Sequence, residues 1–365
     1  MAHIELFKRQ YLQLQELDSL AFPPDGLLRE ASVQARLYVD MFMEDSNPYM
    51  PPERYQMRVL KKLISMIENS ISDPDEDEIS SDLMTCLSSF MVKPLPSEST
   101  SAQQKAYVSY SLPSDLGKSA DYEKSMVTLL ESRSLISGAG TTGLRTWEAA
   151  LHLGTFLTSP IGRGLVEGRN VLELGAGTGF VSILCAKYLC ANSVLATDGD
   201  EGVVENMSTN AFLNGLDNGG KLAVRPLKWG RMLSDNELSD YRGQLPNYDL
   251  VLGADITYDV SIIPLLVSSL TDLFNRFPKV QVIVAATLRN EDTFRSFEKA
   301  CSESMKVDEI REAERVEEKH NLDIVPVDAA VPTLKNQSGL FHPTEVPIRI
   351  SSITRAGPAS DPFAI

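Results

Sequence analysis

The sequence predicts an α/β protein in which a mostly helical N-terminal domain is followed by a doubly wound, mostly parallel sheet. Two observations support this fold class. From about residue 106 onward, short β-rich runs alternate with helical stretches, as in sheets whose parallel strands are joined by helices on both faces. Before that point, apolar residues recur at helical spacing. We therefore divide the chain into residues 1–105 and residues 106–365.

The predicted N-terminal domain has the periodicity of helices. Leu60, Leu63, Ile64 and Ile67 fall on one helix face, and pairs of prolines separate such stretches. Between residues 94 and 104 the composition turns to Ser, Pro and Thr, which is typical of a linker between domains.

The predicted second domain contains six segments with the composition and length of strands. In chain order they are Asn170–Leu174, Ser193–Asp198, Lys221–Leu227, Tyr248–Ala254, Val280–Thr287 and Val346–Ile353. No helix follows the last segment, so we expect it to be an antiparallel strand that closes the sheet.

Composition and charge exclude several classes of function. The 365 residues suit two domains, no apolar run reaches the ~20 residues that span a bilayer, and the N-terminus lacks the apolar core of a signal peptide. The four cysteines and four histidines show no metal-ligand spacing, so we expect reduced thiols in a cytoplasmic protein and no metal site. A net charge of −16 argues against nucleic acid as a partner and is compatible with a cationic target such as lysine.

The strongest chemical signal is a glycine turn directly after the first strand of the sheet. Gly175, Gly177 and Gly179 form G-x-G-x-G, whereas a dinucleotide fingerprint would place the third glycine at position 180, which is Phe180. Glu173 lies just before the turn, where a carboxylate suits the cationic amino-acid end of S-adenosylmethionine better than a pyrophosphate. The alternative is a tight turn that binds no ligand.

Further residues are expected to face the same ligand, and two of them, Asp198 and Trp229, fall at strand ends. Asp198 ends the second strand, where an acidic group can accept hydrogen bonds from ribose hydroxyls; Asp200 is the reserve, and a helix cap is the alternative role for Asp198. Trp229 follows the third strand and can contact an adenine ring. Trp147 is expected near the same pocket, although either tryptophan could simply belong to the core.

The fourth strand ends in Gly253-Ala254-Asp255-Ile-Thr-Tyr258, at the point where the strand order reverses. The segment lacks both the Asn/Asp-Pro-Pro-aromatic sequence of enzymes that methylate base nitrogens and a nucleophilic cysteine. Asp255 and Tyr258 could instead orient an amine. The alternative is a helix-capping Asp beside a packed Tyr.

Together these motifs resemble the seven-β-strand protein lysine methyltransferases. The resemblance rests on Gly140–Ala150, the glycine turn, Leu227–Gly230, Asp255-x-x-Tyr258 and Thr287–Asn290, with a helical region in front. It implies a seven-stranded, Rossmann-like methyltransferase sheet, S-adenosylmethionine as the cofactor, and a protein substrate in the cytoplasm. Within the family it implies elongation factor 2, with trimethyl-lysine as the product and the helical domain recognising the substrate. Nothing in the sequence requires a membrane partner or a second copy of the chain.

The resemblance also implies roles for individual residues. The residues expected to bind the cofactor, together with Glu173, are Trp147, Gly175, Ala176, Gly177, Asp198, Trp229 and Ala254. Asp255 would orient the acceptor lysine by a charge-assisted hydrogen bond and Tyr258 would form a wall beside it. Three alternatives remain open: the same chemistry on another protein, a cofactor-binding subunit without catalysis, and a small-molecule N-methyltransferase.

Overall fold

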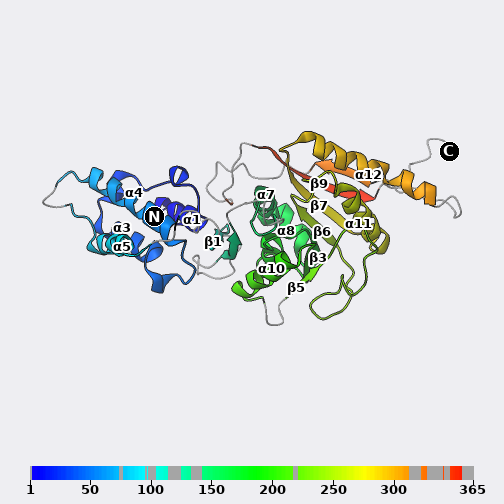
Figure 1. The fold of residues 1–365 in the computed structure, drawn as a ribbon, viewed down its shortest axis with the longest axis horizontal. Coiled ribbons are helices and arrows are strands. Elements are labelled where there is room, and N and C mark those ends of the chain that lie inside the picture. The colour runs from blue at the N-terminus through cyan, green and yellow to red at the C-terminus, as the bar shows by residue number, and fades with distance from the viewer. Residues whose placement is uncertain are drawn as a thin grey trace. The chain divides into compact units, whose positions relative to one another are not determined.

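The structure is a computed structural model that describes residues 2–73, 77–94, 97, 104–113, 125–132, 142–216, 221–311, 322–326, 340 and 346–355 (Figure 1). The chain divides into two compact units. Unit 1 comprises Met1–Leu112 and Glu123–Ala139, and unit 2 comprises Pro113–Tyr122 and Gly140–Ile365.

Unit 1 is mostly helical, in agreement with the prediction. Its elements before residue 100 are α1 (Ala2–Leu12), η1 (Leu17–Ser19), α2 (Asp25–Leu28), α3 (Ala31–Met41), η2 (Glu44–Ser46), α4 (Glu53–Ser70) and α5 (Ser81–Val92). The apolar face predicted from periodicity lies on α4, where Leu60, Leu63 and Ile67 are fully buried. They pack with Phe7 of α1 and Leu37 of α3 in one hydrophobic core.

Unit 1 also contains a two-stranded antiparallel sheet that the sequence analysis did not place there. Its strands are β1 (Lys105–Ser111) and β2 (Met126–Ser132). The hydroxyl of Tyr110 donates to Glu131 across the pair at 2.8 Å. Strand β1 contacts α1, and Met126 packs against the helical core. The division into units therefore differs from the boundary expected at residue 105, because these contacts join the hairpin to the helices.

Seven strands among the described residues of unit 2 form one sheet in the order β5-β4-β3-β6-β7-β9-β8. The strands are β3 (Asn170–Leu174), β4 (Ser193–Asp198), β5 (Leu222–Pro226), β6 (Leu250–Ala254), β7 (Gln281–Thr287), β8 (Leu322–Pro326) and β9 (Ile348–Arg355). Strands β3 to β7 are parallel, and β9 is antiparallel to both of its neighbours. The predicted antiparallel strand is confirmed, but it lies inside the sheet, with β8 at the edge.

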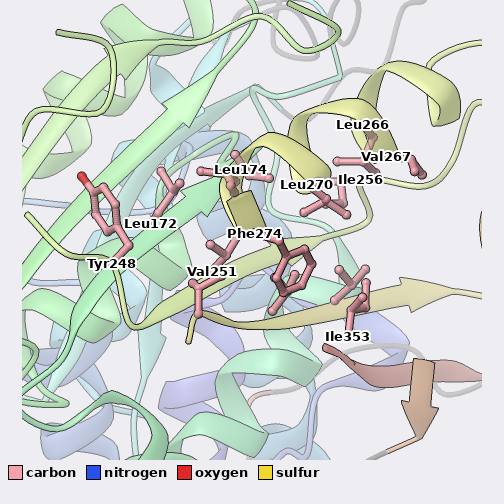
Figure 2. Close-up of a cluster of buried hydrophobic side chains, with 14 of the residues drawn as sticks. Leu172, Leu174, Tyr248, Val251, Ile256, Leu266, Val267, Leu270, Phe274 and Ile353 are labelled. Carbon is pink, nitrogen blue, oxygen red and sulfur yellow. The ribbon is translucent and has the colours of Figure 1, made fainter. Parts of the chain in front are cut away.

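Helices cover both faces of this sheet (Figure 1). They are α7 (Glu148–Thr158), α8 (Pro160–Val166), α9 (Phe180–Lys187), α10 (Glu201–Leu213), α11 (Ile263–Arg276) and α12 (Glu291–Arg311). Because side chains alternate along a strand, Leu172 and Leu174 of β3 face α11, where they pack with Leu270 and Phe274 (Figure 2). Glu173, between them in sequence, faces α9 and bonds to its Ser182.

The strand order places the candidate site. The chain runs outward from β3 through β4 to β5, and then returns to β6 on the other side of β3. Loops that leave β3 and β6 therefore diverge at the carboxyl ends of these strands, and ligands of such sheets bind in the crevice formed there. The glycine turn, Asp198 and Asp255 all belong to this edge.

Candidate active site

The glycine turn connects β3 to α9 in a conformation that favours glycine. Gly175, Gly177 and Gly179 have φ angles of 60°, 56° and 83°, in the left-handed region that side chains with a Cβ rarely adopt. Space is also restricted. A Cβ on Gly175 would lie 2.8 Å from Cγ2 of Ile256, and one on Gly177 would lie 3.2 Å from the carbonyl oxygen of Gly143. Glycine is therefore strongly favoured at these positions, and the backbone of Gly175 and Gly177 carries no side chain of its own.

Asp198 lies against this turn. Its Oδ2 accepts a hydrogen bond from the Gly177 N–H at 3.1 Å, and its Oδ1 accepts one from the Asp200 N–H at 3.1 Å. Burial raises the pKa of the Asp198 carboxyl above its usual value. The helix cap considered for Asp198 is instead Asp200, whose Oδ1 accepts from the N–H of Val203 at the start of α10. Asp198 thus connects the end of β4 to the glycine turn.

Glu173 is enclosed between the sheet and α9. Its side chain is 2% exposed and accepts a hydrogen bond from the Ser182 hydroxyl. Burial raises the pKa of Glu173 to about 8, so the carboxyl is mostly protonated at neutral pH in this environment. Because burial favours the protonated form, a role toward a cationic ligand requires that the ligand stabilise the ionised form.

Asp255 connects the ends of two neighbouring strands. It follows β6 with a φ of 52°, and its N–H donates to Ala285 of β7 at 2.8 Å. Its carboxylate accepts from both the N–H and the hydroxyl of Thr287, at 2.8 and 2.9 Å. Burial raises its pKa, while the Thr287 bonds and the positive charge of Arg289 act in the opposite direction. It is not a helix cap, because the residue before α11 is Ile262.

Tyr258 and Trp229 follow the carboxyl ends of β6 and β5. Tyr258 is 61% exposed, so it is not the packed tyrosine of the alternative interpretation. Trp229 follows β5 and is half-buried, with part of its ring packed against the core on the α11 side. A Cβ on Gly175 would lie 3.4 Å from Cζ2 of Trp229, so the indole also borders the glycine turn. Packing against the core therefore does not prevent Trp229 from also contacting a ligand at the turn. Ala254, the last residue of β6, is half-buried beside Asp255.

Trp147 lies in a charged cluster at the start of α7. Its Nε1–H donates to the carbonyl of Thr142 at 3.0 Å. The guanidinium groups of Arg289 and Arg145 lie 4.7 and 5.2 Å from the centre of its ring, and both arginines pair with Glu148. Cations over an indole face are attracted by its electron density, so both arginines favour this position of the ring.

Comparison with known proteins identifies the family. A sequence profile described as lysine methyltransferase matches residues 133–303. Protein-lysine N-methyltransferase EFM3 of Chaetomium thermophilum is 44% identical over 346 residues, which cover 95% of this chain and 96% of that protein. The chain is a protein-lysine methyltransferase. This methyltransferase is also similar to EFM3 of Saccharomyces cerevisiae, with 37% identity over 48% of the chain and 53% of that protein. Protein-lysine N-methyltransferase EEF2KMT of Mus musculus is 28% identical over 80% of the chain and 84% of that protein.

S-adenosylmethionine is the cofactor of this methyltransferase, and the residues at the carboxyl edge of the sheet fit it. Gly175 and Gly177 carry no side chain at the turn, which suits close contact between their backbone and a ligand. The carboxylate of Asp198 stands beside that turn as an acceptor for hydroxyl groups. Among the described residues no group of three or more His, Cys, Asp and Glu side chains could hold a metal ion. The described helices include none long and apolar enough to span a membrane.

Sequence reasoning missed several residues of the candidate site. Thr287 and Arg289 were noted only as part of the family resemblance, without a role. The pair formed by the Thr146 and Thr178 hydroxyls, 2.7 Å apart, links the segment before α7 to the glycine turn and was not anticipated. One signal could have found Thr287, because it ends a predicted strand beside the strand that carries Asp255.

Proposed function

We propose that this methyltransferase transfers methyl groups from S-adenosylmethionine to one lysine of elongation factor 2 in the cytoplasm, with trimethyl-lysine as the product. The observation that carries the proposal is the similarity to EEF2KMT of Mus musculus, whose name specifies that target and which matches over 80% of this chain. The site supports a lysine acceptor, since an anionic carboxylate at Asp255 suits a cationic side chain.

The residues proposed to bind the cofactor lie at or just after the carboxyl ends of strands β3, β4, β5 and β6 and at the start of α7. They are Trp147, Glu173, Gly175, Ala176, Gly177, Asp198, Trp229 and Ala254. Asp198 would accept the ribose hydroxyls, and the glycine turn would offer its backbone to the amino-acid end of the ligand. The bound sulfonium supplies the methyl group for an in-line displacement.

Asp255 and Tyr258 are proposed to receive the acceptor lysine. Thr287 uses one acceptor position on each oxygen of Asp255, and a carboxylate offers about four such positions, so acceptor capacity is left for an amine. The exposed ring and hydroxyl of Tyr258 would form one wall of the lysine channel. Only ~0.1% of a free lysine is neutral near pH 7.4, and an anionic Asp raises a lysine pKa. Asp255 is therefore assigned to capturing and orienting the amine.

Unit 1 is proposed to recognise the protein substrate. A small acceptor molecule would not require an additional helical unit in the same chain. The similarity to EFM3 of Chaetomium thermophilum extends over 95% of this chain and therefore includes that unit. We accordingly propose that unit 1 contributes to the choice of protein and that unit 2 performs the transfer.

The test of this function is a methylation assay with defined acceptors. The purified protein is incubated with radiolabelled S-adenosylmethionine and a lysate from a strain that lacks its gene, and labelled bands are identified by mass spectrometry. We expect one band, elongation factor 2, and no label with Asp255→Ala. A band of different identity would overturn the target and keep the chemistry. Cofactor binding without any labelled protein would favour a non-catalytic subunit.

A further inference from the structure

The carboxylate of Asp255 is fixed by hydrogen bonds from a single residue on the adjacent strand. Both of its carboxylate oxygens accept hydrogen bonds from Thr287, Oδ1 from the N–H at 2.8 Å and Oδ2 from the hydroxyl at 2.9 Å. The two residues are 32 positions apart in sequence and meet because β6 and β7 are adjacent. The N–H bond restrains one oxygen, and the hydroxyl bond restrains the other.

The backbone of Asp255 shows that this arrangement is imposed. Asp255 has a φ of 52°, in a region that costs free energy for a residue with a side chain, although Asp tolerates it better than most. The N–H of Asp255 also bonds to Ala285 of β7. Three hydrogen bonds to one strand end therefore keep Asp255 in a conformation that it would not adopt alone, as is common at functional sites.

We propose that Thr287 is a positioning residue of this methyltransferase, whose hydroxyl fixes the plane of the Asp255 carboxylate so that its free acceptor positions meet the lysine amine. The inference rests on the proposed role of Asp255 as the acceptor-lysine group. Thr287 itself need not touch the substrate.

The physical reason lies in the rotation of a carboxylate about its last torsion angle. That torsion is broad and roughly two-fold when a single partner restrains it. With only the backbone N–H of Thr287 as donor, the group could turn and present its acceptor positions in several directions. Two donors on separate oxygens remove this freedom before the substrate arrives. Orientation secured in advance supplies much of the rate in a displacement that requires nitrogen, carbon and sulfur in line.

The charged groups around Asp255 lie in the segment after β7 and in α7. Arg289, two residues after Thr287, is the nearby cation, and it pairs with Glu148 of α7 at 2.6 Å. Glu148 also pairs with Arg145. The charge of Arg289 favours the ionised form of Asp255, and that of Glu148 disfavours it. The Thr287 hydroxyl adds a direct hydrogen bond that also favours ionisation, so its removal must raise the pKa of Asp255.

The test compares Thr287→Val, which keeps the branched shape and loses the hydroxyl, with Thr287→Ser, which keeps the hydroxyl. The matched control is Thr271→Val, which removes a hydroxyl that bonds only to the carbonyl of Val267 within α11. For Thr287→Val we expect unchanged cofactor affinity by calorimetry and a fall in kcat of roughly 10- to 100-fold, as for a slightly misplaced catalytic group. Thr287→Ser and Thr271→Val should retain most of the rate.

The pH profile separates positioning from a merely structural role. The plot of log kcat/KM against pH should change slope from two to one where Asp255 ionises, because lysine must also lose a proton. In Thr287→Val this break should move to higher pH, and in Thr287→Ser it should stay in place. Normal turnover with an unmoved break in folded Thr287→Val would overturn the inference. If Asp255→Ala is fully active, the proposed acceptor site itself has failed, and the two failures are thereby distinguished.

Discussion

Asp198 and Asp200 are two positions apart, yet their carboxylates bind different parts of the molecule. Asp198 connects β4 to the glycine turn through Gly177, whereas Asp200 caps α10 through Val203. An acid that only caps a helix contributes to stability and not to ligand affinity. The pair therefore provides an internal control for the cofactor site.

Asp198→Ala should weaken cofactor binding by about 1.5–3 kcal/mol, the range for a hydrogen bond that involves a charged group. Asp200→Ala should leave the affinity unchanged and lower stability by about 0.5–2 kcal/mol, the range for a lost N-cap. Calorimetric titration with S-adenosylmethionine and thermal unfolding of both variants measure these quantities. Equal affinities for Asp198→Ala and the wild type would remove Asp198 from the cofactor site.

Glu173 makes the stability of unit 2 depend on pH. Its pKa of about 8 in the folded protein lies above the value near 4.3 expected in an unfolded chain. The folded state therefore holds a proton that the unfolded state has lost, and stability falls as pH rises through this interval. The contribution is complete below about pH 4 and is lost by the time the pH passes the folded pKa.

The variant Glu173→Gln cannot titrate and resembles the protonated acid in shape. It should abolish this dependence of stability on pH. The free energy of unfolding of the wild type minus that of the variant should decrease between about pH 5 and pH 7.5. Denaturant unfolding at several pH values, followed by a signal from unit 2, provides the measurement. If the free energies of unfolding of the two proteins change with pH in parallel, the folded state does not hold this proton.

At the scale of elements, the connection from β3 to α9 is the segment that we propose to contact the cofactor. Each glycine in it has a positive φ, and α9 starts at Phe180, directly after Gly179. The segment around Gly143 lies against the turn at Gly177. The turn is therefore enclosed by backbone on one side and by Asp198 on another, and little space remains for a side chain.

Gly177→Val should abolish detectable cofactor binding. A β-branched side chain is strongly disfavoured at a φ of 56°, and its Cβ would lie 3.2 Å from the carbonyl oxygen of Gly143. Calorimetric titration of the folded variant, with secondary structure checked by circular dichroism, tests this. Gly164→Val is the matched control, because Gly164 of α8 has no atom within 4 Å of its Cβ position. Retained affinity in Gly177→Val would exclude the turn from the site.

At the scale of the whole molecule, each unit has a hydrophobic core of its own. The core of unit 1 is formed by the helices around Leu63, and one core of unit 2 lies between the sheet and α11 (Figure 2). Units with separate cores commonly unfold in separate transitions. This separation makes the proposed division between substrate recognition and catalysis testable in the intact chain.

Leu63→Ala, in the core of unit 1, should lower the stability of that unit by about 2–5 kcal/mol and leave the transition of unit 2 in place. S-adenosylmethionine should raise the transition of unit 2 alone, because a ligand stabilises only the state that binds it. Scanning calorimetry measures both effects. Between the two transitions we expect cofactor binding to persist and methylation of elongation factor 2 to be lost. Full methylation under those conditions would contradict a recognition role for unit 1.

The local pattern of the sequence determined the elements and the cofactor turn. Helical spacing identified α4, and β-rich composition identified six strands of the large sheet, since both signals lie within a few residues of the chain. The G-x-G-x-G spacing identified the turn, and the strand ends predicted that Asp198 would lie near it, as the structure confirms. The elements and the turn depend on neighbours in the chain, whereas the expectation for Asp198, 21 positions from Gly177, depends on parallel strands ending at one edge of the sheet.

Only the tertiary structure decided which distant residues meet. The position of β9 between β7 and β8, and the attachment of the β1–β2 hairpin to the helices, depend on packing between elements. The same is true of the hydrogen bond from Thr287 to Asp255, 32 positions away, and of the hydrogen bond from Arg289 to Glu148, 141 positions away. No periodicity encodes such pairs, because they form only where separate strand ends are brought to one edge of the sheet.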